Sequence, residues 1–309
     1  MSKRAFLFPG QGAQAVGMGR DFCDIYAIAA ETFHEAEGLT GLPMRKICSE
    51  GPESELGRSD VCQPALLTLS IAILRVIRDV HPQDSECMGA AGLSLGEYSA
   101  LVCADSIAFG DAVKLVQKRG RLMQQAAEAR PGGMAAIVGL TDSDVEAICA
   151  DAARDGTVCA PANYNAPEQL VITGDKATVE KAAAACKERG ATMVTHLDVA
   201  GAYHCMLMKS AADAMREVLN DVEIRAPKFS IISNVTAAPH GEPADIRECL
   251  IRQVTSPVRW KHSMAWLINE GFTVFREIGP GRVLCGLLRR IDRSRPCASI
   301  NSCDQLSKF

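Results

Sequence analysis

The segment of residues 92–96 reads G-L-S-L-G and places Ser94 between two glycines. Short predicted elements flank it: a buried strand over residues 88–91 and a helix from Glu97 to about residue 104. Glycines permit a strained turn that presents a serine hydroxyl, and the N–H groups at the start of the helix point to the same spot. The pattern predicts a nucleophilic serine; the alternative is a plain glycine-rich connection.

A serine needs a base before it can act as a nucleophile. Of the six histidines, His204 is the best candidate, because it lies in a loop of small residues between a predicted strand and a predicted helix. The others are interpreted as surface, turn or structural residues: His34, His81, His196, His240 and His262.

Strands and helices alternate along most of the chain, which predicts an α/β fold with a parallel central sheet. The first strand covers residues 5–8 and ends at the turn Pro9–Gly12, and an apolar helix begins at Pro64. Helices over 111–129, 206–220, 243–254, 258–269 and 281–292, strands over 229–233 and 273–277, and an edge strand over 297–300 complete this part.

Residues 131–198 show a different pattern, β-α-β-β-α-β within about 65 residues. Its strands are expected at 134–140, 158–164, 169–173 and 192–197, with a turn at 165–167. This is the ferredoxin-like arrangement. We therefore predict a large α/β-hydrolase-like domain, residues 1–130 and 199–309, with a small ferredoxin-like domain inserted at 131–198.

The composition excludes several classes of protein. The 309 residues carry 33 Lys and Arg against 37 Asp and Glu, a net charge of −4, with 48% hydrophobic and 5% aromatic residues. Disorder, nucleic-acid binding and a stacking platform for single strands are all disfavoured. The apolar runs at 5–8 and 65–77 are too short for a secretion signal or a membrane span, which favours a cytoplasmic protein.

Thirteen cysteines are present, an odd number, and none stands at C-x-x-C spacing. Many lie in apolar stretches, where cysteine behaves as a small hydrophobic residue. We expect them to be unpaired, in a reducing compartment, and to bind no metal.

Five separated motifs occur in an order that closely resembles the malonyl-CoA:acyl carrier protein transacylases of fatty-acid synthesis. The resemblance spans roughly residues 5–292. The motifs are FPGQGAQ at 8–14, QPAL at 63–66, GLSLGEY at 92–98, AYHCMLM at 202–208 and GPGRVL at 279–284. That family also has an inserted ferredoxin-like domain.

The resemblance implies the roles of the central residues. Ser94 is the nucleophile and His204 the general base, and a backbone carbonyl near Gln253 orients the imidazole in place of the usual carboxylate. The N–H groups of Gln11 and Leu95 form the oxyanion hole. Many bacterial members have a histidine before the nucleophile, where this chain has leucine.

The resemblance also implies how substrates are held. Arg119 matches the family's substrate arginine, and a guanidinium can grip the free carboxylate of a malonyl group with two hydrogen bonds; the ordinary alternative is a solvated helix face. Gln63 and Asn165 match polar positions of the pocket. No metal or cofactor is implied, because the phosphopantetheine arm belongs to the partner.

The partners implied are malonyl-CoA and acyl carrier protein, and we expect a monomer. Acyl carrier proteins are acidic, so a C-terminal basic run is a candidate docking surface; a solvated face is the alternative. The run comprises Arg282, Arg289, Arg290, Arg293 and Arg295.

Several alternatives stay open. An acyltransferase of polyketide synthesis or malonate decarboxylation would share the motifs. A serine esterase or thioesterase would need an acid between Ser94 and His204 in the chain, and the obvious candidate, Asp198, is only six residues before His204. A non-catalytic binding module would not need Ser94, His204 and Arg119 together.

Overall fold

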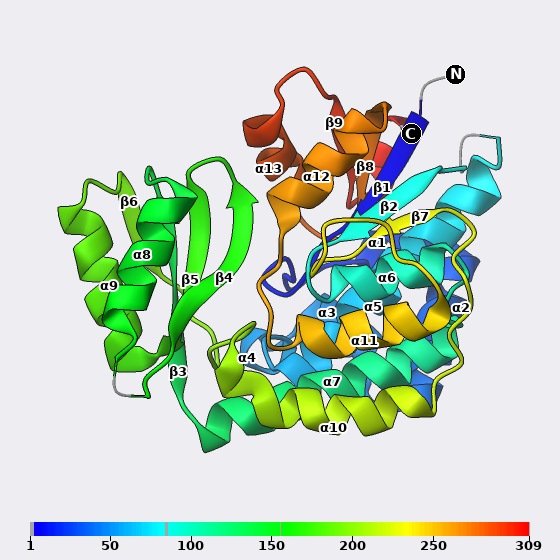
Figure 1. The fold of residues 1–309 in the computed structure, drawn as a ribbon. Coiled ribbons are helices and arrows are strands. Elements are labelled where there is room, and N and C mark those ends of the chain that lie inside the picture. The colour runs from blue at the N-terminus through cyan, green and yellow to red at the C-terminus, as the bar shows by residue number, and fades with distance from the viewer. Residues whose placement is uncertain (1–2, 84–85, 155, 309) are drawn as a thin grey trace.

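In the computed structural model, which describes residues 3–83, 86–154 and 156–308, the chain forms two β-sheets flanked by helices (Figure 1). The larger sheet has five strands, all parallel, in the order β7-β2-β1-β8-β9. They are β1 (Lys3–Phe8), β2 (Gly89–Gly92), β7 (Ser230–Ile232), β8 (Phe272–Ile278) and β9 (Cys297–Ile300). The predicted parallel sheet is confirmed, with the strand at 297–300 on its edge.

The register of this sheet brings two turns together. Phe8, the last residue of β1, pairs with Gly92, the last residue of β2. The segments that follow, 9–12 and 93–96, therefore leave the sheet side by side, at the carboxyl ends of β1 and β2. Glycine is required here, because a Cβ atom on Gly96 would collide with the carbonyl oxygen of Phe8 and one on Gly10 with that of Leu93.

The helix α5 (Ser59–Val80) is the centre of the helical layer and packs against α2 (Ala27–Thr40), α6 (Gly96–Cys103) and α7 (Phe109–Ala129). It is the only helix in the described ranges that is long and apolar enough to cross a membrane. Of its most apolar 18-residue stretch, 89% is buried inside the protein. The prediction that it begins at Pro64 is wrong. It begins at Ser59, and Pro64 lies in the second turn.

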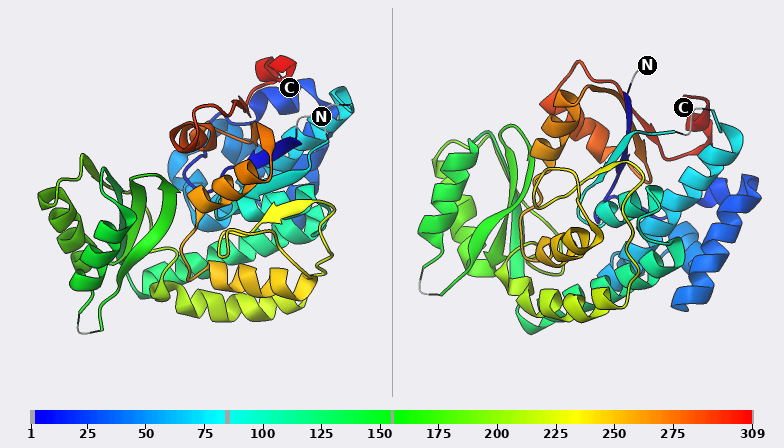
Figure 2. Two further views of the ribbon diagram at one scale, coloured as in Figure 1. Left: turned by 45° about the horizontal axis from the view of Figure 1, so that its top comes forward. Right: turned by 45° about the vertical axis from the view of Figure 1, so that its right-hand side comes forward.

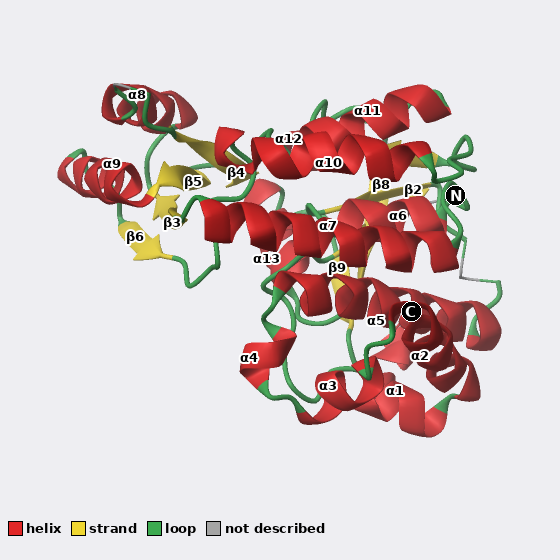
Figure 3. Ribbon diagram, turned by 90° about the horizontal axis from the view of Figure 1, so that it is seen from below, coloured by secondary structure: helices red, strands yellow, loops and turns green. Residues whose placement is uncertain are grey.

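The remaining helices of this part surround the sheet. Figure 3 shows α10 lying beside α7, and the two are in contact. The short helices before α5 were not predicted, because each is too short to show a helical period. All the remaining helical segments of the large part, predicted or not, are α1 (Arg20–Ile25), α3 (Met44–Glu50), α4 (Glu53–Leu56), the 3₁₀ turn Met206–Met208, α10 (Lys209–Asn220), α11 (Pro243–Gln253), α12 (Trp260–Asn269), α13 (Val283–Ile291) and the 3₁₀ segment Cys303–Lys308.

The second sheet is antiparallel and stands to one side of the molecule (Figure 2). Its strand order, β4-β5-β3-β6, together with the chain order β-α-β-β-α-β, is the ferredoxin-like topology predicted for this region. It has a core of its own between the sheet and its two helices. The elements are β3 (Gly132–Val138), α8 (Asp142–Ala152), β4 (Cys159–Ala166), β5 (Gln169–Asp175), α9 (Lys176–Glu188) and β6 (Met193–His196).

Two expectations about this chain are wrong. Asn165 lies inside β4 and not in a turn, because β4 stays paired with β5 as far as Ala166. Cys285 and Cys297 form a disulfide, although unpaired cysteines were expected. The packing of α13 on β9 brings their Cα atoms to 5.3 Å, whereas the other cysteines of the described residues are free.

Candidate active site

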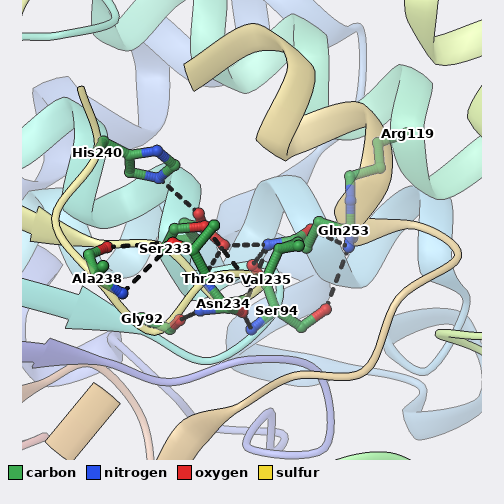
Figure 4. Close-up of polar contacts among 11 residues, drawn as sticks. Gly92, Ser94, Arg119, Ser233, Asn234, Val235, Thr236, Ala238, His240 and Gln253 are labelled. Carbon is green, nitrogen blue, oxygen red and sulfur yellow. Dashed lines mark hydrogen bonds and ion pairs between the residues drawn. The ribbon is translucent and has the colours of Figure 1, made fainter. Parts of the chain in front are cut away.

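Ser94 lies in the turn between β2 and α6 with a backbone φ of 52°, a left-handed conformation that is strained for a residue with a side chain. The buried amide of Asn234 holds this turn (Figure 4). Its Oδ1 accepts a hydrogen bond from the Ser94 N–H at 2.6 Å, and its Nδ2 donates to the Gly92 carbonyl at 2.7 Å. Asn234 therefore spans the turn and stabilises the backbone conformation of Ser94.

His204 contacts Ser94 directly. Its Nε2 lies 2.9 Å from the Ser94 Oγ, and its Nδ1 lies 2.9 Å from the backbone carbonyl oxygen of Gln253 at the end of α11. A carbonyl can only accept, so Nδ1 carries the proton and Nε2 is free to receive one from the serine. Three segments far apart in the sequence thus meet in the geometry of a serine and its base, and the residue that orients the base is a carbonyl.

Burial keeps this base neutral. Desolvation, with a smaller contribution from the nearby Arg119 guanidinium, lowers the pKa of His204 to about 4, against the opposing effect of the Gln253 and Ser256 carbonyls. A neutral imidazole is the form that accepts a proton, so His204 can act as a base over a wide pH range.

We predict from this shift that acylation of the serine stays nearly constant from pH 8 down to pH 5.5. An ordinary histidine with pKa 6.5 would be only about one-tenth neutral at pH 5.5 and would give a tenfold loss. Single-turnover rates across this range measure the effect.

Tryptophan fluorescence must be recorded in parallel, because the unfolded chain protonates His204 below about pH 6.5 while the folded chain does so only near 4, and stability falls as the pH drops between them. A tenfold loss of rate at pH 5.5 in protein that is still folded would contradict the prediction.

Arg119 comes from α7 and is almost completely buried, with 1% of its surface exposed. Its guanidinium donates to the Ser94 Oγ at 3.1 Å, to Gln253 Oε1 at 3.0 Å and to Gln63 Oε1 at 2.7 Å. The ring of Tyr98 lies 5.4 Å from it. The solvated helix face weighed for Arg119 is therefore wrong, because α7 turns this side chain into the interior.

The hydrogen bonds of Arg119 within the described chain go to amide and hydroxyl oxygens and none to a carboxylate, while its Nε has no partner. Desolvation by burial lowers the pKa of Arg119, against the opposing effects of Tyr98 and of the nearby Glu97 carboxylate. A buried cation without an anionic partner is costly. The arrangement is that of a site which receives a negatively charged group next to Ser94.

A cavity of about 670 Å³ opens between the small sheet and the carboxyl ends of the strands of the large sheet, where Ser94 lies. Gln63 reaches Arg119, whereas Asn165 lines the cavity with its buried Oδ1 unpartnered. The N–H of Leu95 stands at the start of α6, where helix N–H groups lack internal partners. The predicted residues that line the cavity are Gln11, Gln63, Ser94, Arg119, Asn165 and His204.

Sequence reasoning missed three residues next to these groups: Asn234, Glu97 and His240. Glu97 and His240 form a buried pair, Nε2 to Oε1 at 2.7 Å, and so the interpretation of His240 as a turn residue without further role is incomplete. Glu97 left one signal, a charged residue in an otherwise apolar predicted helix. In the part of the chain that the structure describes, no group of three or more His, Cys, Asp or Glu side chains could hold a metal ion.

A serine at a strand-to-helix turn of a parallel sheet, with a buried histidine on its hydroxyl, defines the class of enzymes that form acyl-serine intermediates. The sequence profile of the acyl transferase domain matches residues 5–305. The chain belongs to this acyltransferase family.

Its relatives are named more specifically. A malonyl CoA-acyl carrier protein transacylase of Haemophilus influenzae is 44% identical over 302 residues, 97% of this chain and 96% of that protein. The crystal structure of an acyl carrier protein S-malonyltransferase of Vibrio cholerae superposes with a TM-score of 0.95 at 43% identity, covering 99% of both chains. A malonyl-transacylase in complex with a type II polyketide synthase acyl-carrier protein has a TM-score of 0.96 at 40% identity, covering 99% of this chain and 98% of that one.

Proposed function

We propose that this acyltransferase moves the malonyl group of malonyl-CoA to the phosphopantetheine thiol of acyl carrier protein and so supplies the chain extender for fatty-acid synthesis. The observation that carries the proposal is the buried Arg119 guanidinium, 3.1 Å from the Ser94 hydroxyl and without an anionic partner. A malonyl group brings a carboxylate two carbons from its thioester. The names of the relatives point to the same reaction.

The first half-reaction acylates the serine. His204 Nε2 takes the Ser94 proton as Oγ attacks the thioester carbonyl, and the N–H groups of Gln11 and Leu95 stabilise the oxyanion. The carbon–sulfur bond then breaks, His204 gives its proton to the departing sulfur, and CoA leaves as the free thiol, so that His204 is neutral again. Arg119 exchanges its neutral partners for the malonyl carboxylate.

The second half-reaction reverses these steps with another thiol. The phosphopantetheine thiol of the carrier protein gives its proton to His204 and attacks the malonyl-serine ester. The ester bond breaks, and Ser94 Oγ recovers the proton. The burial of the site limits competing attack by water. The chain then needs no metal or cofactor of its own, since both thiols belong to the substrates.

Intact-mass measurement tests this sequence of events. The protein mixed with malonyl-CoA gains one malonyl group, which peptide mapping locates on Ser94, and added acyl carrier protein removes the group and gains its mass. Malonate released to water instead would favour a hydrolase, and no mass gain would refute the proposal. Carrier proteins from fatty-acid and polyketide synthesis, compared side by side, separate the two pathways.

The basic run at the C-terminus is the proposed docking surface for the acidic carrier protein. Arg282, Arg289, Arg290 and Arg293 are exposed on or beside α13, and α13 also lines the cavity through Val283 and Leu287. A partner seated there would hold its thiol near the mouth of the site. The structure of a relative bound to an acyl-carrier protein supports a partner of this kind.

Reversing two of these charges, Arg289→Glu with Arg290→Glu, is predicted to slow transfer to the carrier protein about tenfold while acylation by malonyl-CoA stays unchanged. Charge reversal at a docking rim acts on association and leaves the buried chemistry intact. The matched control reverses two exposed charges of α7, Lys114→Glu with Arg121→Glu. Equal loss in both half-reactions, or equal loss in the control, would contradict the assignment.

The organisation of the chain completes the proposal. We assign residues 1–130 and 199–309 to the large domain and 131–198 to the inserted small domain, with the substrate entering between them. The separate hydrophobic core of the small sheet supports this division. Working on CoA thioesters and carrier-protein thiols, the enzyme would act in the cytoplasm as a monomer.

A further inference from the structure

A buried charged pair, Glu97 and His240, adjoins the site and has no part in the transfer steps. Both side chains are completely inaccessible to solvent, and His240 Nε2 lies 2.7 Å from Glu97 Oε1. They come from α6 and from the loop after β7, 143 positions apart in the chain. Burying a carboxylate and an imidazole costs free energy, so the pair calls for a reason beyond packing.

The second oxygen of Glu97 connects the pair to the site. It accepts a hydrogen bond from Gln253 Nε2 at 2.6 Å and another from the Asn234 backbone N–H at 3.2 Å. A carboxylate only accepts hydrogen bonds, so it fixes the orientation of the Gln253 amide, with Nε2 toward Glu97. The amide Oε1 is then the atom that faces Arg119, at 3.0 Å.

Gln253 is in contact with three groups of the proposed reaction. Its backbone carbonyl binds His204 Nδ1, its Oε1 binds Arg119, and its Nε2 also donates to the backbone oxygen of Ser94 at 2.9 Å. Figure 4 shows Gln253 between Arg119 and the network around Asn234. A turn of its amide would place an N–H donor against the Arg119 guanidinium, which is itself only a donor.

We propose that Glu97 and His240 are positioning residues of the transfer reaction: the ionised Glu97, stabilised by His240, holds Gln253 so that its two oxygens orient the base and the substrate arginine. This inference rests on the proposed function. Neither residue contacts the serine hydroxyl in the structure, and both act through Gln253.

The charge on the pair explains why a histidine is needed. A buried carboxylate without a cationic partner takes up a proton, and a protonated Glu97 no longer fixes the Gln253 amide. Burial by itself would lower the pKa of His240, but the Cys249 thiol on α11 and the Glu97 carboxylate outweigh it and raise the pKa to about 9. The pair is therefore ionic at neutral pH.

The test compares His240→Ala, His240→Gln and Glu97→Gln with the wild type in single-turnover acylation from pH 6 to pH 9, using malonyl-CoA and acetyl-CoA. The exposed His34→Gln serves as control. We expect a flat profile for the wild type and the control. In His240→Ala, Glu97 loses its cation and its proton returns, so the rate at pH 6 is about tenfold below that at pH 8.

The other variants separate positioning from packing. Glu97→Gln removes the charge and is expected to slow acylation by malonyl-CoA about 10–100-fold at every pH and to weaken the preference for malonyl over acetyl. His240→Gln keeps the volume and donates a neutral hydrogen bond but supplies no charge, so it is expected to fold and to show the same loss of rate at pH 6 as His240→Ala. Flat profiles with wild-type preference in all three variants would overturn the inference, as would losses matching only the unfolded fraction. A wild type that takes no malonyl group refutes the proposed function instead.

Discussion

The Ser94→Ala variant is expected to take up no malonyl group and to transfer malonyl to acyl carrier protein at least about 10⁴-fold more slowly than the wild type. The reason is that the covalent route disappears, and direct attack by the second thiol has neither the serine nor a base aligned with it. Loss of a catalytic serine costs about 10⁶ in rate where binding and oxyanion donors remain. Intact mass after mixing with malonyl-CoA, and radiolabel transfer to the carrier protein, measure the two effects.

Ser99→Ala is the matched control for this variant. Ser99 lies on α6, one turn beyond the nucleophile, and its buried hydroxyl has no hydrogen-bond partner in the structure. Its removal deletes the same atom from the same region without touching His204 or Arg119. An adduct that persists in Ser94→Ala would place the nucleophile elsewhere and overturn the mechanism.

Arg119→Ala is expected to lower the preference for malonyl-CoA over acetyl-CoA by about 10²–10³-fold. Removing one partner of a buried, hydrogen-bonded charge pair typically costs about 2–5 kcal/mol, of which each 1.4 kcal/mol is a factor of ten. Acetyl has no carboxylate and loses only what the guanidinium contributes to holding the Ser94 hydroxyl and Gln253. The ratio of kcat/KM values for the two thioesters therefore isolates the carboxylate contact.

Two further substitutions define this effect. Arg119→Lys retains the charge but not the planar fork, so it should restore only part of the preference. Arg121→Ala removes an exposed arginine two residues further along the same helix and should leave the ratio unchanged. If Arg119→Ala lowers kcat/KM equally for malonyl-CoA and acetyl-CoA, Arg119 orients the serine and does not select the substrate.

The fold followed largely from local patterns. The β-α-β-β-α-β order of residues 131–198 is visible because apolar residues alternate with the period of each element, and the strand at 297–300 was located at its observed bounds. The sequence placed the start of α5 at Pro64 instead of Ser59, because proline favours the first turn of a helix but is not restricted to it. The helices α3 and α4 carry too few residues for a period.

Fewer of the site residues could be predicted from the sequence alone. Spacing pointed to Ser94, and motif resemblance to His204, Arg119 and Gln253. Nothing local distinguished His240, in a turn-like Pro-His-Gly sequence, or Asn234 after its strand. Both matter only because α6 and the loop after β7 pack together, which places His240 against a carboxylate and Asn234 against the Ser94 N–H.

The sequence by itself determined the class of fold, the serine and the family, because turn geometry, periodicity and motif order are written in neighbouring residues. The tertiary structure decided which polar groups are buried and which of them meet. It showed that Arg119 is buried and that its described hydrogen bonds go to neutral groups, and it showed that Cys285 is joined to Cys297. Burial and pairing are properties of segments that are distant in the chain, and their free energy exists only once those segments have packed.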